Sequence, residues 1–173
     1  MPKVLACRVF ARELRYLRPD LSADYFEPMC HRLQPAKFAA YVESQIKGHT
    51  LLVCGDCGGL AAVAERGRIR ILPGRDCIDL LLPERQAATV YLTGGWLENL
   101  DVIFGLEGKP RVVRDAVLRA LLSGVRKVVY VRTLASKRGE SKAEALARML
   151  GCKFESIEGS LDALSKGLQE AGA

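Results

Sequence analysis

Short apolar runs alternate along the chain with longer segments whose apolar residues recur every three or four positions. The short runs predict strands over residues 3–7, 23–28, 50–54, 68–72, 88–93, 127–132 and 153–157. The longer segments predict helices over residues 8–18, 35–48, 58–66, 76–82, 97–104, 110–122, 141–150 and 160–170. This alternation predicts an α/β fold: a mostly parallel, open, doubly wound sheet of the Rossmann-like kind, with helices on both faces.

The length of 173 residues and the apolar content of 49% suit a single globular domain spanning residues 1–173. No internal repeat, low-complexity tract or linker divides the chain. Residues 136–141 are charged and follow the sixth predicted strand, so we interpret them as a solvated loop or as a lid.

Cysteines recur where the predicted strands give way to turns. Cys7 ends the first strand, Cys54 and Cys57 follow the third, and Cys77 follows the fourth after a short turn. The carboxyl ends of parallel strands form one rim of an open sheet, and ligands bind at that rim. We therefore expect these thiols, which are distant in sequence, to be neighbours at one site.

Cys54 and Cys57 form a Cys-x-x-Cys motif, the strongest local signal for chemistry. At a helix start the motif suits redox exchange, whereas together with other thiolates it suits zinc or an iron–sulfur cluster. No second Cys-x-x-Cys is present, so Cys7 and Cys77 are the natural further ligands. His31 could complete the set, because imidazole binds most transition metals.

Several neighbouring residues could support such a site. Arg75 and Asp76 precede Cys77, where a guanidinium lowers a thiol pKa and a carboxylate can serve as a supporting partner. Trp96 could cover the site or stack on a flat ligand, or it could simply belong to the edge of the core. Glycines after the strand ends would let the backbone approach a ligand closely. These glycines are Gly55, Gly58, Gly94 and Gly95.

Two cysteines are not among the predicted ligands. In an extended segment Cys30 and His31 would point in opposite directions, so both would not be ligands together. Cys152 lies between a helix and a strand on the far edge, where we expect it to be structural.

Charge and composition limit the possible partners. The net charge of +6 does not indicate nucleic acid, because the basic residues lie on helix faces and aromatic residues make up only 6% of the chain. No apolar stretch reaches the roughly 20 residues that span a bilayer, and the first residues lack the pattern of a signal peptide. We expect a cytoplasmic protein with no membrane contact, whose thiols are reduced.

Five motifs resemble those of one known family: Ala6-Cys7 before Glu13, His31 before Pro35, Cys54-Gly55-Asp56-Cys57-Gly58-Gly59-Leu60, Arg75-Asp76-Cys77-Ile78 and Tyr91-Leu92-Thr93-Gly94-Gly95-Trp96-Leu97. Over roughly residues 4–135 the chain is similar to the uncharacterised domain-of-unknown-function family number 1638. The family has tyrosine where this chain has Cys54, and proline where it has Gly94. Its members are often encoded near corrinoid-dependent methyltransferases. The resemblance implies a partner in one-carbon metabolism and singles out four residues: Cys7, His31, Cys57 and Cys77.

These observations leave three functions open. The first is a protein that binds a metal ion or an iron–sulfur cluster through Cys7, Cys57 and Cys77, with His31 or Cys54 as the fourth ligand. It would act, as an enzyme or an accessory protein, on a small thiol or methyl carrier in corrinoid-dependent methyl transfer. The second is a metal-free thiol-redox or thiol-transfer enzyme that uses Cys54 and Cys57. The third is a non-enzymatic partner of a methyltransferase or corrinoid protein, with the cysteines as packing residues.

Overall fold

The computed structural model describes residues 3–134 and 136–172, and within them seven strands form two separate sheets. Every paired strand runs parallel to its neighbour. The first sheet has the order β2-β1-β3-β4 and the second β5-β6-β7. The strands are β1 (Val4–Cys7), β2 (Ala23–Phe26), β3 (Leu51–Val53), β4 (Arg70–Ile71), β5 (Thr89–Leu92), β6 (Lys127–Arg132) and β7 (Lys153–Glu158).

The central strands are apolar on both faces. All four residues of β1 are buried, as are all three of β3 and the stretch 128–131 of β6. A strand covered on both faces needs an unbroken apolar run in place of an alternating one, and parallel sheets of this kind have helices on both sides. The burial of these strands follows directly from their composition.

Helices connect the strands and cover the two sheets. Two short 3-10 turns also occur, η1 (Arg8–Phe10) and η2 (Met29–His31). The α-helices of the described residues are α1 (Ala11–Leu17), α2 (Pro35–Glu43), α3 (Leu60–Gly67), α4 (Gly94–Glu98), α5 (Leu100–Phe104), α6 (Arg111–Leu121), α7 (Lys137–Leu150) and α8 (Asp162–Glu170). None of them is both long and apolar enough to cross a bilayer.

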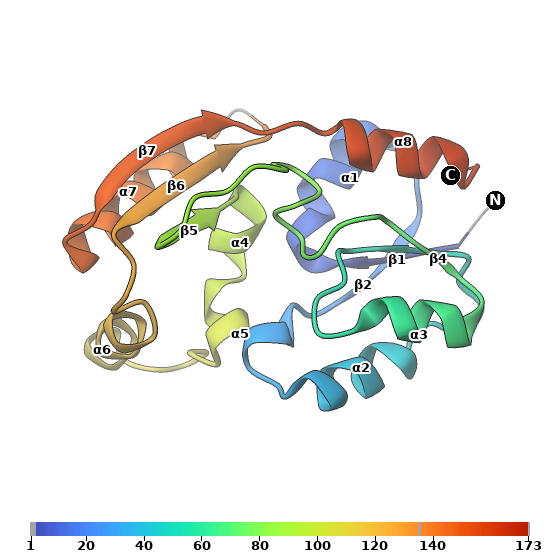
Figure 1. Ribbon diagram of the computed structural model, residues 1–173, viewed down its shortest axis with the longest axis horizontal. Coiled ribbons are helices and arrows are strands. Elements are labelled where there is room, and N and C mark those ends of the chain that lie inside the picture. Colours follow the sequence, from blue (N-terminus) through green and yellow to red (C-terminus); the bar gives the residue numbers. More distant parts are fainter. Residues whose placement is uncertain (1–2, 135, 173) are drawn as a thin grey trace.

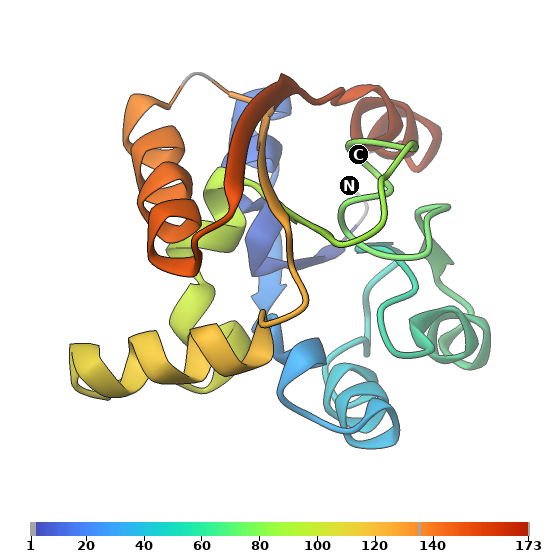
Figure 2. The ribbon, with the colours of Figure 1, turned by 60° about the vertical axis from the view of Figure 1, so that its left-hand side comes forward.

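The two sheets lie side by side, with α4 and α5 between them (Figure 1). The last helix, α8, leaves the second sheet and returns to the first, so α7 and α8 lie at opposite ends of the molecule (Figure 2). Gly167 of α8 packs directly on Leu72, and Glu170 forms an ion pair with Arg70. The C-terminal helix therefore ties the two halves together around one contiguous core.

The predicted parallel α/β fold is confirmed, but three details differ. The strands divide between two sheets, because the hydrophobic pattern identifies strands without specifying their partners. Residues 136–141 are not a loop: Ser136 accepts a hydrogen bond from the Gly139 N–H at 3.2 Å and caps α7. Residues 76–82 form turns where a short helix was predicted.

Candidate functional site

Five of the six cysteines line one small cavity at the carboxyl ends of β1 and β3. The chain contributes them from separate segments: Cys7, Cys30, Cys54, Cys57 and Cys77. The space that they enclose is about 10 Å³, roughly the room needed by one water-sized sphere. The expected gathering of Cys7, Cys54, Cys57 and Cys77 around a common space is therefore present in the fold.

Cys57 interacts with two other cysteines of this cluster. The thiols of Cys30 and Cys77 lie beside its sulfur. Hydrogen bonding with these two thiols and with the backbone N–H of Cys77 lowers the pKa of Cys57, although burial opposes this shift. The same interactions, together with burial, raise the pKa values of Cys30 and Cys77. Cys57 is thus the thiol of the group whose ionised form its neighbours favour.

Cys7 and Cys54 lie on the inner side of the cavity. Burial raises the pKa of Cys7 to about 12 and also raises that of Cys54 well above its ordinary value. Neighbouring sulfurs add to both shifts, because a second negative charge close to the first is unfavourable. Both side chains are buried in the core, and their surroundings favour the neutral thiol.

The position of Cys30 differs from the sequence-based prediction. The segment Met29–His31 is a 3-10 turn (η2) and not extended chain, so the alternation argument that excluded Cys30 does not apply. The turn brings the thiol of Cys30 to Cys57 and places the His31 ring 5.1 Å from that of Trp96. Pro28, two residues before Cys30, was the available signal that the extended segment ends there.

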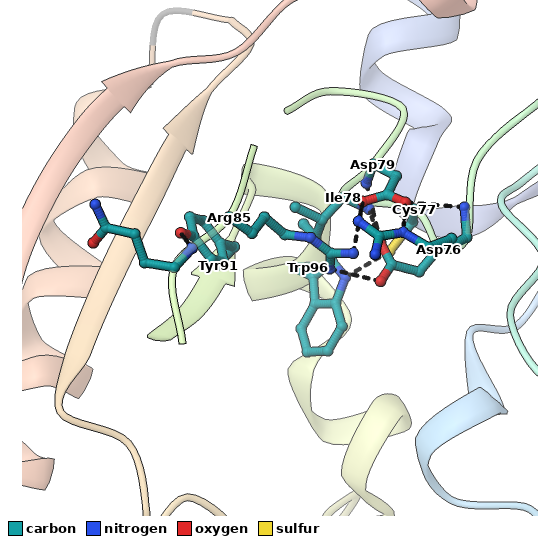
Figure 3. A network of polar contacts seen from close by, with 9 residues as sticks. Asp76, Cys77, Ile78, Asp79, Arg85, Tyr91 and Trp96 are labelled. Atoms are coloured by element: carbon teal, nitrogen blue, oxygen red, sulfur yellow. Dashed lines mark hydrogen bonds and ion pairs between the residues drawn. The ribbon is translucent and has the colours of Figure 1, made fainter. Parts of the chain in front are cut away.

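A polar network fixes the segment that carries Cys77 (Figure 3). One carboxylate oxygen of Asp76 accepts hydrogen bonds from the backbone N–H groups of Ile78 and Asp79, at 2.9 and 3.0 Å. Arg85 bridges the two aspartates, at 2.7 Å from Asp76 and 2.6 Å from Asp79. Sequence reasoning missed Arg85, because nothing in its immediate neighbourhood resembles a motif.

Trp96 and Arg75 complete this network. The indole N–H of Trp96 donates to the sulfur of Cys77 over 3.2 Å, so this side chain contacts the cluster directly. Arg75 forms its ion pair with Asp79 at 2.6 Å, and its side chain is largely exposed. Asp76 therefore supports Cys77 through the backbone, whereas Arg75 supports it only through Asp79.

A wider pocket of about 350 Å³ opens onto the outer side of the cluster. Its wall includes three of the cysteines, Cys30, Cys57 and Cys77. The rest of the lining mixes aromatic, charged and aliphatic side chains from both halves of the molecule: His31, Arg75, Asp76, Ile78, Arg85, Val90, Tyr91 and Trp96. A small molecule in this pocket would reach the half-buried Cys57 from solvent.

The four glycines serve different purposes. A side chain on Gly55 would overlap the backbone of Asp76, and one on Gly95 would overlap the backbone of Val9. Both glycines therefore allow close packing of protein segments and not of a ligand. Gly58 lines the wide outer pocket, and Gly94 lines a separate one.

The thiols are close together, but they are not arranged as a finished metal centre. Within residues 3–134 and 136–172, no three His, Cys, Asp or Glu side chains converge in a way that could hold a metal ion. The predicted ligand set of Cys7, Cys57 and Cys77 with His31 or Cys54 consequently stays a prediction. His31 is exposed on the outer side, near enough to Cys57 to contribute to the lowering of the Cys57 pKa.

Fold and site together define an α/β protein with a thiol-lined cavity at the carboxyl ends of two parallel strands, β1 and β3. A family model described as "Protein of unknown function (DUF1638)" matches residues 25–168, and the chain belongs to that family. A search of curated proteins finds no match.

Two solved structures show weak similarity to the whole chain. Both are mutants of a periplasmic metal binding protein from Candidatus Liberibacter asiaticus. The metal-free one has a TM-score of 0.29 at 9% identity and the Mn-bound one 0.27 at 10%, with 98% of each chain covered. At these scores the likeness carries no argument about the metal or the role of this protein.

Proposed function

We propose that the protein binds one thiophilic metal ion through Cys30, Cys57 and Cys77. The observation that carries this proposal is the position of Cys57, which lines both the inner cavity and the outer pocket together with Cys30 and Cys77. Three sulfurs from three segments of the chain are thus already neighbours. Thiolates are the preferred ligands of soft and borderline cations such as zinc.

The metal ion would bind by replacing the thiol protons of the ligating cysteines. A divalent ion would form metal–sulfur bonds to the three cysteines and release the protons of the bound thiols to water, without any change of oxidation state. Small rotations of the half-buried Cys30 and Cys57 would bring their sulfurs into ligating positions. His31, on the open side of the group, is the candidate for a fourth ligand.

The inner cavity has no room for an iron–sulfur cluster held by Cys7 and Cys54. Its space of about 10 Å³ suits one atom, whereas a cluster there would have to displace core side chains such as Phe26 and Ile103. Cys7 and Cys54 line the same cavity and would then remain thiols that exclude water. Among single ions, zinc fits a set of cysteine and histidine ligands best.

Titration with Co²⁺ under anaerobic conditions tests this assignment, because thiolate ligation gives Co²⁺ an intense near-ultraviolet charge-transfer band. We expect one equivalent to bind and the band to be lost in Cys57→Ser. Cys152→Ser is the matched control, since Cys152 contacts the carbonyl of Val125 and lies outside the cavity. Absence of the band in the wild type, or its full retention in Cys57→Ser, would contradict the proposal.

A second candidate is metal-free thiol–disulfide exchange, which the opening of the outer pocket onto Cys57 favours. The Cys57 thiolate would attack a small disulfide, form a mixed disulfide and release one thiol. Cys30 or Cys77 would then displace the second thiol and leave a disulfide within the protein. These partners are preferred over Cys54, since both line the outer pocket together with Cys57 and Cys54 does not.

Alkylation separates the two candidates. Rapid reaction of Cys57 with iodoacetamide in protein as purified would support thiol exchange. Slow reaction that accelerates after chelation would support the metal ion. Association with a corrinoid protein or methyltransferase remains a prediction from the family resemblance, and co-purification tests it.

A further inference from the structure

A second pocket, of about 200 Å³, lies on the other side of α4 from the thiol cluster. Segments that follow three different strands form it: Arg12 after β1, Gly94 after β5, and residues 136–142 after β6. The carboxyl ends of parallel strands are the usual place for ligands in α/β proteins. The thiol chemistry proposed above makes no use of this pocket.

The lining of this pocket is strongly basic. Arg12, Arg138 and Lys142 contribute three cations, and Glu98 is the one carboxylate among the lining residues. Glu98 lies 3.4 Å from Arg12, at the long end of ion-pair distances. In the described part of the chain, neither Arg138 nor Lys142 has a carboxylate within 4.0 Å. Three cations with one acid leave an excess of positive charge among the residues that line this pocket.

The local backbone adds to this arrangement. Gly94 has no side chain, and a Cβ there would lie 2.5 Å from the Arg12 guanidinium, so the glycine lets this group lie against the start of α4. Gly139 makes similar room for the hydroxyl of Tyr130. Ser136 caps α7 and Gly139 belongs to its first turn; α7 is a helix of 14 residues whose N-terminal dipole favours negative charge.

We propose that this pocket binds a small oxyanion, with phosphate or the phosphate group of a small metabolite as the chemical class. Arg12, Arg138 and Lys142 would supply the countercharge, and the hydroxyl of Ser136 would supply a further donor. Glu98 opposes binding by its charge. The proposal is independent of the metal and thiol chemistry proposed above, and evidence against either of those functions would not count against it.

Calorimetric titration of the full chain with inorganic phosphate tests the site. Arg138→Gln and Lys142→Gln should each weaken binding by about tenfold, since each removes a charged hydrogen-bond donor. Arg148→Gln, an exposed position further along α7, is the matched control and should bind as the wild type does. Glu98→Gln should bind more tightly than the wild type, because it removes the opposing charge.

Three results would overturn the proposal: no phosphate binding by the wild type at millimolar concentration, equal losses in Arg138→Gln and Arg148→Gln, or weaker binding in Glu98→Gln. Vesicles of phosphatidylglycerol distinguish a lipid surface from a free ligand. We expect no vesicle binding, and vesicle binding without binding of free phosphate would likewise contradict the assignment.

Discussion

The indole N–H of Trp96 donates a hydrogen bond to the sulfur of Cys77, with the two heavy atoms 3.2 Å apart. Trp96 is the one tryptophan in the chain, so tryptophan fluorescence reports on the surroundings of this single indole, which include Cys77. The relationship links a residue on α4, next to the second sheet, with a cysteine that follows the first sheet. Any ligand that captures Cys77 must disturb this hydrogen bond.

We therefore predict that one equivalent of Zn²⁺ changes the Trp96 emission of the reduced protein. The reason is that the indole then faces a metal-bound sulfur in place of a thiol. Cys77→Ser should abolish the change and Cys152→Ser should preserve it. Zinc that binds by competition with a chromophoric chelator, yet leaves the emission of the wild type untouched, would argue against ligation by Cys77.

Loss of Arg85 should loosen the segment around Cys77. Arg85→Gln removes two partly buried ion pairs, with Asp76 and with Asp79, and should lower the free energy of unfolding by about 1 kcal/mol. Urea denaturation measures this difference. Arg18→Gln breaks a pair with Asp20 at the surface and should leave stability unchanged. Equal effects of both substitutions would show that the Arg85 network does not hold this segment.

Gly95→Ala should be among the most damaging small substitutions in the protein. The added methyl group would overlap the backbone of Val9, where η1 packs on α4. Overpacking against backbone should cost about 3 kcal/mol or more, measured by thermal or urea denaturation. Gly124→Ala is the control, because nothing lies within 4 Å of its Cβ position. A stable Gly95→Ala variant would contradict the close approach of these two segments.

Glu13 should make stability depend on pH. Burial raises its pKa above the ordinary value of 4.5, although Thr133 donates a hydrogen bond of 2.7 Å to one carboxylate oxygen. The other oxygen is buried with no partner among the described residues. Between pH 4.5 and the raised pKa, the folded state holds a proton that the unfolded state has lost, so stability falls as pH rises through this window.

Glu13→Gln removes this titration and should flatten the pH dependence of the free energy of unfolding in the same window. At neutral pH the variant should be at least as stable as the wild type, because a neutral amide costs less to bury than a carboxylate. Glu65→Gln, an exposed change on α3, should keep the wild-type slope. An unchanged slope in Glu13→Gln would assign the pH dependence to other groups.

Much of the fold could be predicted because apolar periodicity is a local property. The runs that form β1, β3 and β6 are buried on both faces, and their unbroken apolar composition predicts this. The division into two sheets could not be predicted in this way, since strand partnership depends on distant segments. Serine is a common helix N-cap, and Ser136 does cap α7, but the charged residues around it indicated a loop.

In the candidate site, too, the features that depend on local sequence could be predicted, and those that depend on contacts between distant segments could not. Placing cysteines at strand ends was enough to gather Cys7, Cys54, Cys57 and Cys77 around one cavity. The role of Cys30 depends on a three-residue turn that alternation rules cannot detect. Arg85 forms ion pairs with Asp76 and Asp79 across a turn, and no sequence motif predicts these contacts.

Elemental analysis of protein purified without exposure to air is the sharpest test of the proposed metal site. We expect close to one equivalent of a thiophilic metal, zinc above all, in the wild type and in Cys152→Ser. We also expect Cys57→Ser to lose this metal while remaining folded by circular dichroism. Wild-type protein that carries no metal and takes up none when Zn²⁺ is added would show that the thiols do not form a metal site.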